Sequence, residues 1–247
     1  MVARCETTLT AANVPATVQR MNDNRLSAIA LITASCGMII TMAVHPTGHI
    51  TQAQLDSAIR MLIIVHSFAL FLIPVQFLGA WGLSRRLAGT VRLEVVGLVF
   101  YAMALIAVMS AAVADGLVTP SVFRKIVESA NSEASVNTWQ MFSRYTFAWN
   151  QAYAQVFVAA SSAAILAWSV AMWKSGTFSR GLGIYGCILS IATVAVLFSG
   201  HLVLDAHRFG AVVLGQAIWF VIAGAKLWNE APAQAEPAQA TNPARIL

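Results

Sequence analysis

The sequence predicts an all-α protein, a polytopic transmembrane bundle of six helices, and three observations lead to this fold class. Hydrophobic residues make up 58% of the chain and charged residues only 10%, which is too little charge to cover a water-facing surface. Arginine and lysine residues cluster at the ends of long apolar stretches. Six such stretches have about the 20 apolar residues that a helix needs to cross a bilayer: residues 26–44, 61–83, 95–114, 146–173, 181–204 and 209–225.

The first span, residues 26–44, follows a polar segment at 1–24. No small-residue cleavage site follows this first apolar run, so the sequence predicts a retained anchor rather than a signal peptide. The second span is preceded by Thr51-Gln-Ala-Gln54, a capping-box pattern that predicts a helix start outside the membrane. Pro74 lies near the middle of the second span and predicts a kink, because proline removes a backbone hydrogen bond.

The third span begins beside Glu94, for which we expect an ordinary ion pair with a neighbouring arginine. Residues 116–145 are expected to form the one long outer loop. Within it, Thr119-Pro120 has the pattern of an N-cap followed by proline at the first helical position, and predicts a short amphipathic helix on the membrane surface. An aromatic belt at the interface then leads into the fourth span: Trp139, Phe142, Tyr145 and Trp149.

The fourth and fifth spans carry small residues that allow helices to approach closely in lipid, at 159–164 and at Gly183, Gly186 and Ser190. We therefore place these two spans inside the bundle. After the sixth span the chain becomes rich in alanine, proline and glutamine, which predicts a disordered cytoplasmic tail at 229–247. The sequence thus predicts a single membrane domain at 25–228.

The distribution of basic residues predicts the orientation. Ten of the 15 lysines and arginines fall on one predicted face, which leaves five on the other. The positive-inside rule then places both termini in the cytoplasm of a bacterial cell, with the protein in the inner membrane. These residues are dispersed among the loops and form no basic stripe, so the net charge of +5 does not indicate nucleic-acid binding.

All five histidines lie at the predicted outer end of the bundle. His45 and His49 follow the first span, His201 and His207 lie between the fifth and sixth spans, and His66 lies a turn or two inside the second. Ionisable residues within a membrane are costly and tend to face the bundle interior, so His66 is the first functional candidate. Its alternative is a neutral histidine hydrogen-bonded to a neighbouring helix.

Polar residues near these histidines predict a cavity at the outer end. Gln151 and Gln155 lie on one face of the fourth span at helical spacing, and Asp115 ends the third span. The residues expected to bind a small ligand or cofactor are His45, His66, Gln151, Gln155 and His201. Those expected to hold a transition metal, if their connection turns sharply, are His201, Asp205 and His207. A b-type haem between His66 and His201 is the alternative cofactor.

No catalytic motif is present in the sequence, and the three cysteines have no metal-binding spacing. The leading hypothesis is an inner-membrane protein with a histidine-containing polar cavity, open to the periplasm, that binds a small ligand, metal or cofactor. One alternative is a proton-linked transporter subunit that uses His66 and the glutamine face. The other is a structural accessory subunit without a ligand, in which case the partner is another membrane subunit.

Two segments carry a family resemblance. They are residues 173–183, with the sequence WKSGTFSRGLG, and residues 207–219, with the sequence HRFGAVVLGQAIW. The chain resembles an uncharacterised family of bacterial six-helix integral membrane proteins, a domain of unknown function, over roughly residues 25–228. The resemblance implies a helical bundle in the bacterial inner membrane and carries no activity with it.

Overall fold

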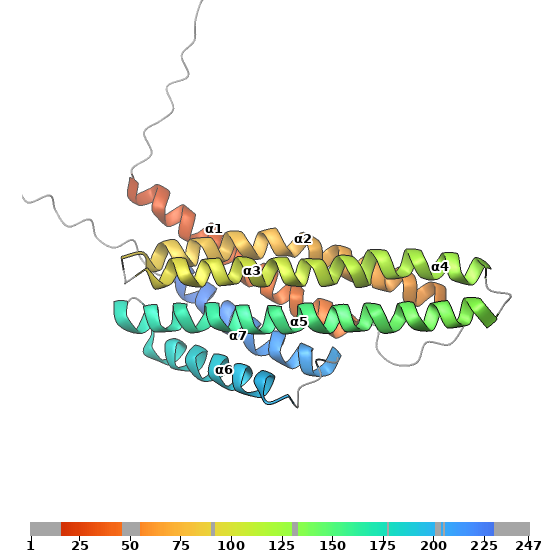
Figure 1. Ribbon diagram of the computed structural model, residues 1–247. Helices are drawn as coiled ribbons and strands as arrows, with labels where there is room; N and C mark the ends of the chain where they lie inside the picture. Colours follow the sequence, from red (N-terminus) through yellow and green to blue (C-terminus); the bar gives the residue numbers. More distant parts are fainter. Residues whose placement is uncertain are drawn as a thin grey trace, which may run out of the picture.

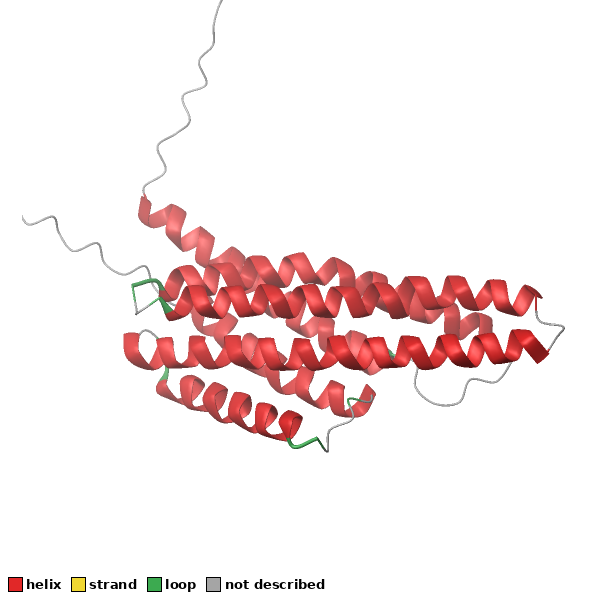
Figure 2. Ribbon diagram, in the orientation of Figure 1, coloured by secondary structure: helices red, strands yellow, loops and turns green. Residues whose placement is uncertain are grey.

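In the computed structural model, all regular secondary structure within the described residues is helical, and short loops and turns join some of the helices (Figure 2). Those residues are 16–45, 55–89, 92–129, 133–176, 178–200, 204 and 206–229. The helices are α1 (Ala16–Val44), α2 (Leu55–Leu87), α3 (Leu93–Val113), the π-helical turn η2 (Ala114–Val118), α4 (Thr119–Ser129), α5 (Glu133–Ser175), α6 (Arg180–Phe198) and α7 (Ala206–Asn229).

Six helical segments are long and apolar enough to cross a membrane, as the sequence predicts. They are Asn22–Val44, Asp56–Leu87, Leu93–Lys125, Asn137–Ser175, Arg180–Phe198 and His207–Asn229. Large hydrophobic side chains are exposed on the outside of the bundle, among them Phe71, Ile188 and Phe198. Exposing so much apolar surface to water is unfavourable, whereas contact with lipid chains is not. The all-α, six-span fold class is therefore confirmed, and the chain is a multi-pass membrane protein.

Neighbouring helices follow one another around the bundle (Figure 1). The helix α1 packs between α2 and α7, α3 packs between α2 and α5, and α6 packs against α5. The centre of the core is aromatic, because Trp168 of α5 and Trp219 of α7 are both completely buried and stack with their centroids 6.1 Å apart. Trp168 Nε1 donates a hydrogen bond to Ser84 Oγ at 2.9 Å, so its polar atom is satisfied inside the bundle.

The small residues of α5 and α6 are buried, and those of α6 lie against α5. Ser161 and Ser162 are buried, and so are Gly183, Gly186 and Ser190. A Cβ atom at Gly186 would overlap Ser169 Oγ and would stand 2.5 Å from Trp219 Nε1. Only glycine allows α6 to come this close, so the packing predicted from small residues is present. The prediction that both spans lie inside the bundle holds for α5 but is wrong for α6, which packs mainly against α5 at the edge of the bundle and has only 22% of its apolar stretch buried, against 56% for α5.

Residues 116–145 differ from the expected outer loop. The helix α3 continues through η2 into α4, and α5 begins at Glu133, so 116–129 and 133–145 are helical. The two helices form a hairpin that extends beyond α6 and α7 (Figure 1). The ring of Phe123 on α4 packs against Trp139 on α5 at 4.3 Å. The amphipathic helix expected at Thr119 thus exists, but it pairs with α5 and prolongs α3.

Several predictions fall outside the described residues. They concern the segment 1–15, the capping box at 51–54, His49, His201, Asp205 and the tail from residue 230 onward.

Candidate metal site and cavity

Three helical segments bring two histidines and one aspartate together at one end of the bundle. His45 directly follows α1, His66 lies in α2 and Asp115 lies in η2. The ligand-type atoms of these three side chains all lie within 4.8 Å of one another. His66 is buried, with 8% of its surface exposed, while His45 and Asp115 are partly buried. We refer to these residues as the His/His/Asp cluster.

The π-helical turn is the local feature that positions Asp115. A π-helical turn inserts one extra residue into a helix, and such turns are rare and often lie at functional sites. Within this turn, Asp115 is followed by Gly116, which is buried directly against His66. A Cβ atom at Gly116 would overlap Cβ of His66 and would stand 2.5 Å from its Cγ. The absence of a side chain at Gly116 therefore allows α2 and η2 to approach closely enough for the two polar groups to meet.

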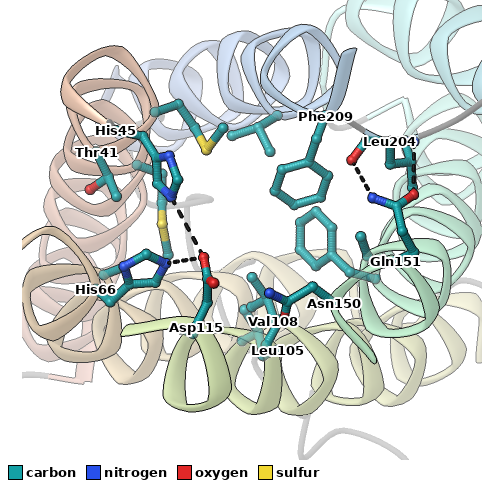
Figure 3. A pocket seen from close by; sticks show the side chains of 18 of the residues that line it. Thr41, His45, His66, Leu105, Val108, Asp115, Asn150, Gln151, Leu204 and Phe209 are labelled. Atoms are coloured by element: carbon teal, nitrogen blue, oxygen red, sulfur yellow. Dashed lines mark hydrogen bonds and ion pairs between the residues drawn. The ribbon is translucent and has the colours of Figure 1, made fainter. Parts of the chain in front are cut away.

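Asp115 is the centre of the cluster, as Figure 3 shows. Its Oδ2 atom lies 3.5 Å from Nε2 of His66 and 3.9 Å from Nε2 of His45. The two imidazole rings meet edge to face, with centroids 5.2 Å apart. Asn150 of α5 interacts with the same carboxylate from the opposite side.

The hydrogen bond of His66 to the backbone determines the tautomer of its neutral ring, and so whether the nitrogen that faces Asp115 carries a hydrogen or a lone pair. Its Nδ1 atom lies 2.8 Å from the carbonyl oxygen of Leu62, one turn earlier in α2. A carbonyl oxygen can only accept, so Nδ1 carries the hydrogen, and in a neutral ring Nε2 is then an acceptor. An ionised carboxylate is also only an acceptor. The Nε2 of His66 and Oδ2 of Asp115 therefore require a proton or a metal ion between them.

The arrangement suits a small divalent metal ion. Zinc bonds to histidine nitrogen and carboxylate oxygen are about 2.0–2.2 Å long, which places neighbouring tetrahedral ligand atoms about 3.4 Å apart. The distances from Asp115 to His66 and His45 are 3.5 and 3.9 Å. The bond from His66 to the Leu62 carbonyl is the outer interaction that fixes the tautomer of a metal-binding histidine. Three protein ligands leave a fourth position open.

A cavity of about 530 Å³ adjoins the cluster inside the bundle. Figure 3 shows Phe209 across the open space from the histidines, and Leu105 and Val108 beside Asp115. Most of its walls are apolar, and two polar atoms of lining residues, Ser143 Oγ and Asn150 Oδ1, are buried and have no hydrogen-bond partner among the residues that the structure describes. The apolar side chains that line it include Met38, Leu105, Val108, Phe157, Phe209, Val213 and Phe220.

Polar groups also line a deeper part of the cavity, and they bond to one another. Ser35 Oγ donates to Gln76 Oε1 at 3.4 Å, and Gln216 Nε2 donates to Ser161 Oγ at 2.9 Å. Both glutamines are buried and line the cavity. Their hydrogen bonds join α1 to α2 and α5 to α7.

The predicted ligand-binding residues take different places. His45, His66 and Gln151 line the cavity. The amide of Gln151 is fully engaged with the backbone of Leu204, donating to its carbonyl at 2.8 Å and accepting from its N–H at 3.0 Å. Gln155 is exposed and is not among the residues that line the cavity.

The predicted metal ligands near α7 are not found together in the described part of the chain. His207 is exposed in the first turn of α7, whereas His201 and Asp205 lie outside the described residues. That metal set therefore stays a prediction. The carboxylate that joins His45 and His66 is instead Asp115, which sequence reasoning places at the same end but leaves out of the ligand sets. Its position at the end of an apolar span was the available signal.

Glu94 lies at the far end of α3, and within the described part of the chain it forms no ion pair of the kind expected for it. Its side chain is buried, with 8% exposed, and its Oε2 atom has no hydrogen-bond partner among the described residues. Arg85, one of the expected partners, instead lies 3.5 Å from Asp23 of α1. Trp168 Nε1 donates a hydrogen bond to the backbone carbonyl of Glu94 at 3.3 Å. Glu94 is therefore held in the bundle beside Trp168, away from the surface arginines.

No protein-family model, curated protein or solved structure matches this chain. The family resemblance is therefore not supported by a match, and the six-helix membrane architecture stands on the structure alone.

Proposed function

We propose that this protein binds a divalent transition metal, with Zn²⁺ as the best fit, through His45, His66 and Asp115. The observation that carries the proposal is the approach of Nε2 of His66 to Oδ2 of Asp115 at 3.5 Å, while Nδ1 of the same ring is held by the Leu62 carbonyl. A metal ion satisfies both atoms and His45 together. Imidazole and carboxylate are common zinc ligands, and a site with three protein ligands keeps a position open for another molecule.

The membrane setting supports the same reading. Burying a histidine and an aspartate inside a membrane protein costs free energy, so such residues are functional candidates. Here both side chains line an internal cavity. The distribution of basic residues supports an orientation in the bacterial inner membrane with the cavity end at the periplasm. The site would then draw its metal from the periplasmic side.

The test is the metal content of the purified protein. We expect about one zinc ion per chain after exposure to zinc and removal of weakly bound metal. The variants His66→Ala and Asp115→Asn should each weaken zinc binding at least about 100-fold, because each removes a direct ligand. His207→Ala is the matched control, since this histidine is exposed at the start of α7. Undiminished zinc in both His66→Ala and Asp115→Asn would contradict the proposal.

Proton transfer is the second candidate, and the same contact favours it. A proton between His66 Nε2 and Asp115 Oδ2 would also satisfy both acceptors, as a proton-linked transporter requires. Protein that binds no zinc, yet loses transport in a proteoliposome assay on substitution of either residue, would favour this candidate. An absorption spectrum of the same sample tests the b-type haem alternative through His66 and His201, because haem gives an intense visible band.

A further inference from the structure

We propose that the cavity binds a single-chain amphiphile with a carboxylate head, such as a fatty acid. Its head would occupy the open metal position beside Asp115, and its chain would lie along the apolar walls toward Gln76 and Gln216. The inference rests on the proposed metal site and adds to it the chemical class of the bound molecule.

The size and walls of the cavity suit an apolar occupant. Its volume of about 530 Å³ lies within the range of ligand pockets in proteins, about 300–1,000 Å³. Water is a poor occupant, because each buried molecule needs about two to four polar partners. The central walls offer few, since they consist of side chains such as Leu105, Val108 and Phe209. In a protein surrounded by lipid, a hydrocarbon chain is the most available molecule of this character.

The shape of the cavity indicates a chain rather than a compact molecule. His66 and Gln76 both line it and are ten residues apart in α2, which corresponds to about 15 Å along a helix. Asp115 and Tyr101 line it in the same way along η2 and α3. An extended saturated chain of medium length spans this distance. The polar groups at the inner end already bond to one another, so the chain needs no second polar group there.

The charge of the site indicates an anionic head. Two neutral imidazoles, one ionised Asp115 and a divalent metal ion leave one positive charge at the open position. A carboxylate neutralises that charge and binds metal through oxygen.

The experiment uses Co²⁺ in place of zinc, because the visible bands of bound cobalt report directly on its ligands. The full chain is placed in nanodiscs of phosphatidylcholine, which has no net charge, and is titrated with dodecanoate or with dodecanol. We expect dodecanoate to change the cobalt bands and dodecanol to leave them unchanged. A parallel sample in nanodiscs with phosphatidylglycerol, without added dodecanoate, tests whether an anionic bilayer lipid is the occupant instead.

Variants in the chain-binding part of the cavity separate the chain from the metal. Val213→Trp fills space in the cavity, and we expect it to weaken dodecanoate binding at least about tenfold while cobalt binding is retained. Leu214→Trp is the matched control, because Leu214 is the next residue of α7 and is exposed on its outer face. Should Val213→Trp fail to fold, Ala154→Phe on α5 narrows the same cavity.

The outcomes distinguish failure of this inference from failure of the metal site. Cobalt that binds but whose bands ignore dodecanoate would overturn the inference and leave the metal site intact. A change of the bands with phosphatidylglycerol alone would assign the cavity to a bilayer lipid and overturn the single-chain assignment. If the protein binds no cobalt and still binds dodecanoate, both the metal site and the proposed binding of the carboxylate head to the metal are overturned.

Discussion

His66 and Asp115 face each other through atoms that need a proton or a metal ion between them. Nε2 of His66 lies 3.5 Å from Oδ2 of Asp115, while Nδ1 of the same ring is held by the Leu62 carbonyl. The carbonyl of α2 thus fixes the ring so that its lone pair points at a carboxylate. This relationship depends on the π-helical turn η2 and on the glycine within it, and it is the basis of the metal site that we propose.

Metal binding should weaken as the pH falls. Imidazole ligands must be neutral to bind a metal, and histidines take up protons between about pH 8 and pH 5. Protons therefore compete with zinc for imidazole ligands, and zinc binding measured by competition with a coloured chelator should fall as the pH is lowered. An affinity that rises on acidification would contradict the proposed ligands.

Gly116→Ala should disrupt the His/His/Asp cluster. The new Cβ atom would overlap Cβ of His66, so η2 and α2 must move apart. We expect zinc affinity to fall at least about tenfold, as it does when a contact that orients a metal ligand is lost. The thermal midpoint should also fall, because the added methyl group overpacks the helix contact. Gly181→Ala is the matched control, because a Cβ atom there meets nothing within 4 Å. Equal zinc affinity in both variants would show that the close approach is not needed.

Gln151→Ala should destabilise the connection between α6 and α7. The change leaves the N–H and the carbonyl of buried Leu204 without their partners, at about 1–3 kcal/mol for each unsatisfied group. Thermal unfolding in detergent should show a clearly lower midpoint. Gln155→Ala is the control, since Gln155 is exposed one turn later in α5. If Gln155→Ala lowers the midpoint as much, the Leu204 bonds are not the cause.

Glu94→Gln should stabilise the protein. The Glu94 carboxylate is buried and its Oε2 atom has no hydrogen-bond partner among the described residues, so an amide removes the cost of burying a charge. We expect a higher thermal midpoint, by the equivalent of about 1 kcal/mol. Asp23→Asn serves as a comparison, because it removes an exposed ion pair with Arg85 and should change little. A lower midpoint for Glu94→Gln would indicate a stabilising partner for the carboxylate.

The orientation can be checked by cysteine labelling in intact cells. In a variant that lacks Cys5, Cys36 and Cys187, a Ser132→Cys substitution should react with a membrane-impermeant maleimide. A cysteine added after Leu247 should react only after the cells are opened. This pattern follows from the excess of basic residues on the face of the termini. The reverse pattern would place the cavity end in the cytoplasm.

The sequence by itself determined the all-α class, the six spans and the close packing of α5 and α6. These properties depend on local composition and spacing. Each apolar stretch is long enough to cross a bilayer, and small residues on a helix allow a neighbouring helix to approach at that point. It also predicted that the histidines lie at one end of the bundle, where the structure describes His45 and His66 together. The choice of His66 as a buried polar residue needed only its position within an apolar span.

Only the tertiary structure decided which carboxylate joins the histidines. Asp115 meets His45 and His66 from segments far apart in the sequence, and this contact depends on one extra residue in a helical turn. The same holds for Gln151 and Gln155, which share a helix face at this spacing yet differ in burial. Helical periodicity gives the direction of a side chain from its own helix, but the rotation and depth of the neighbouring helices determine what it meets.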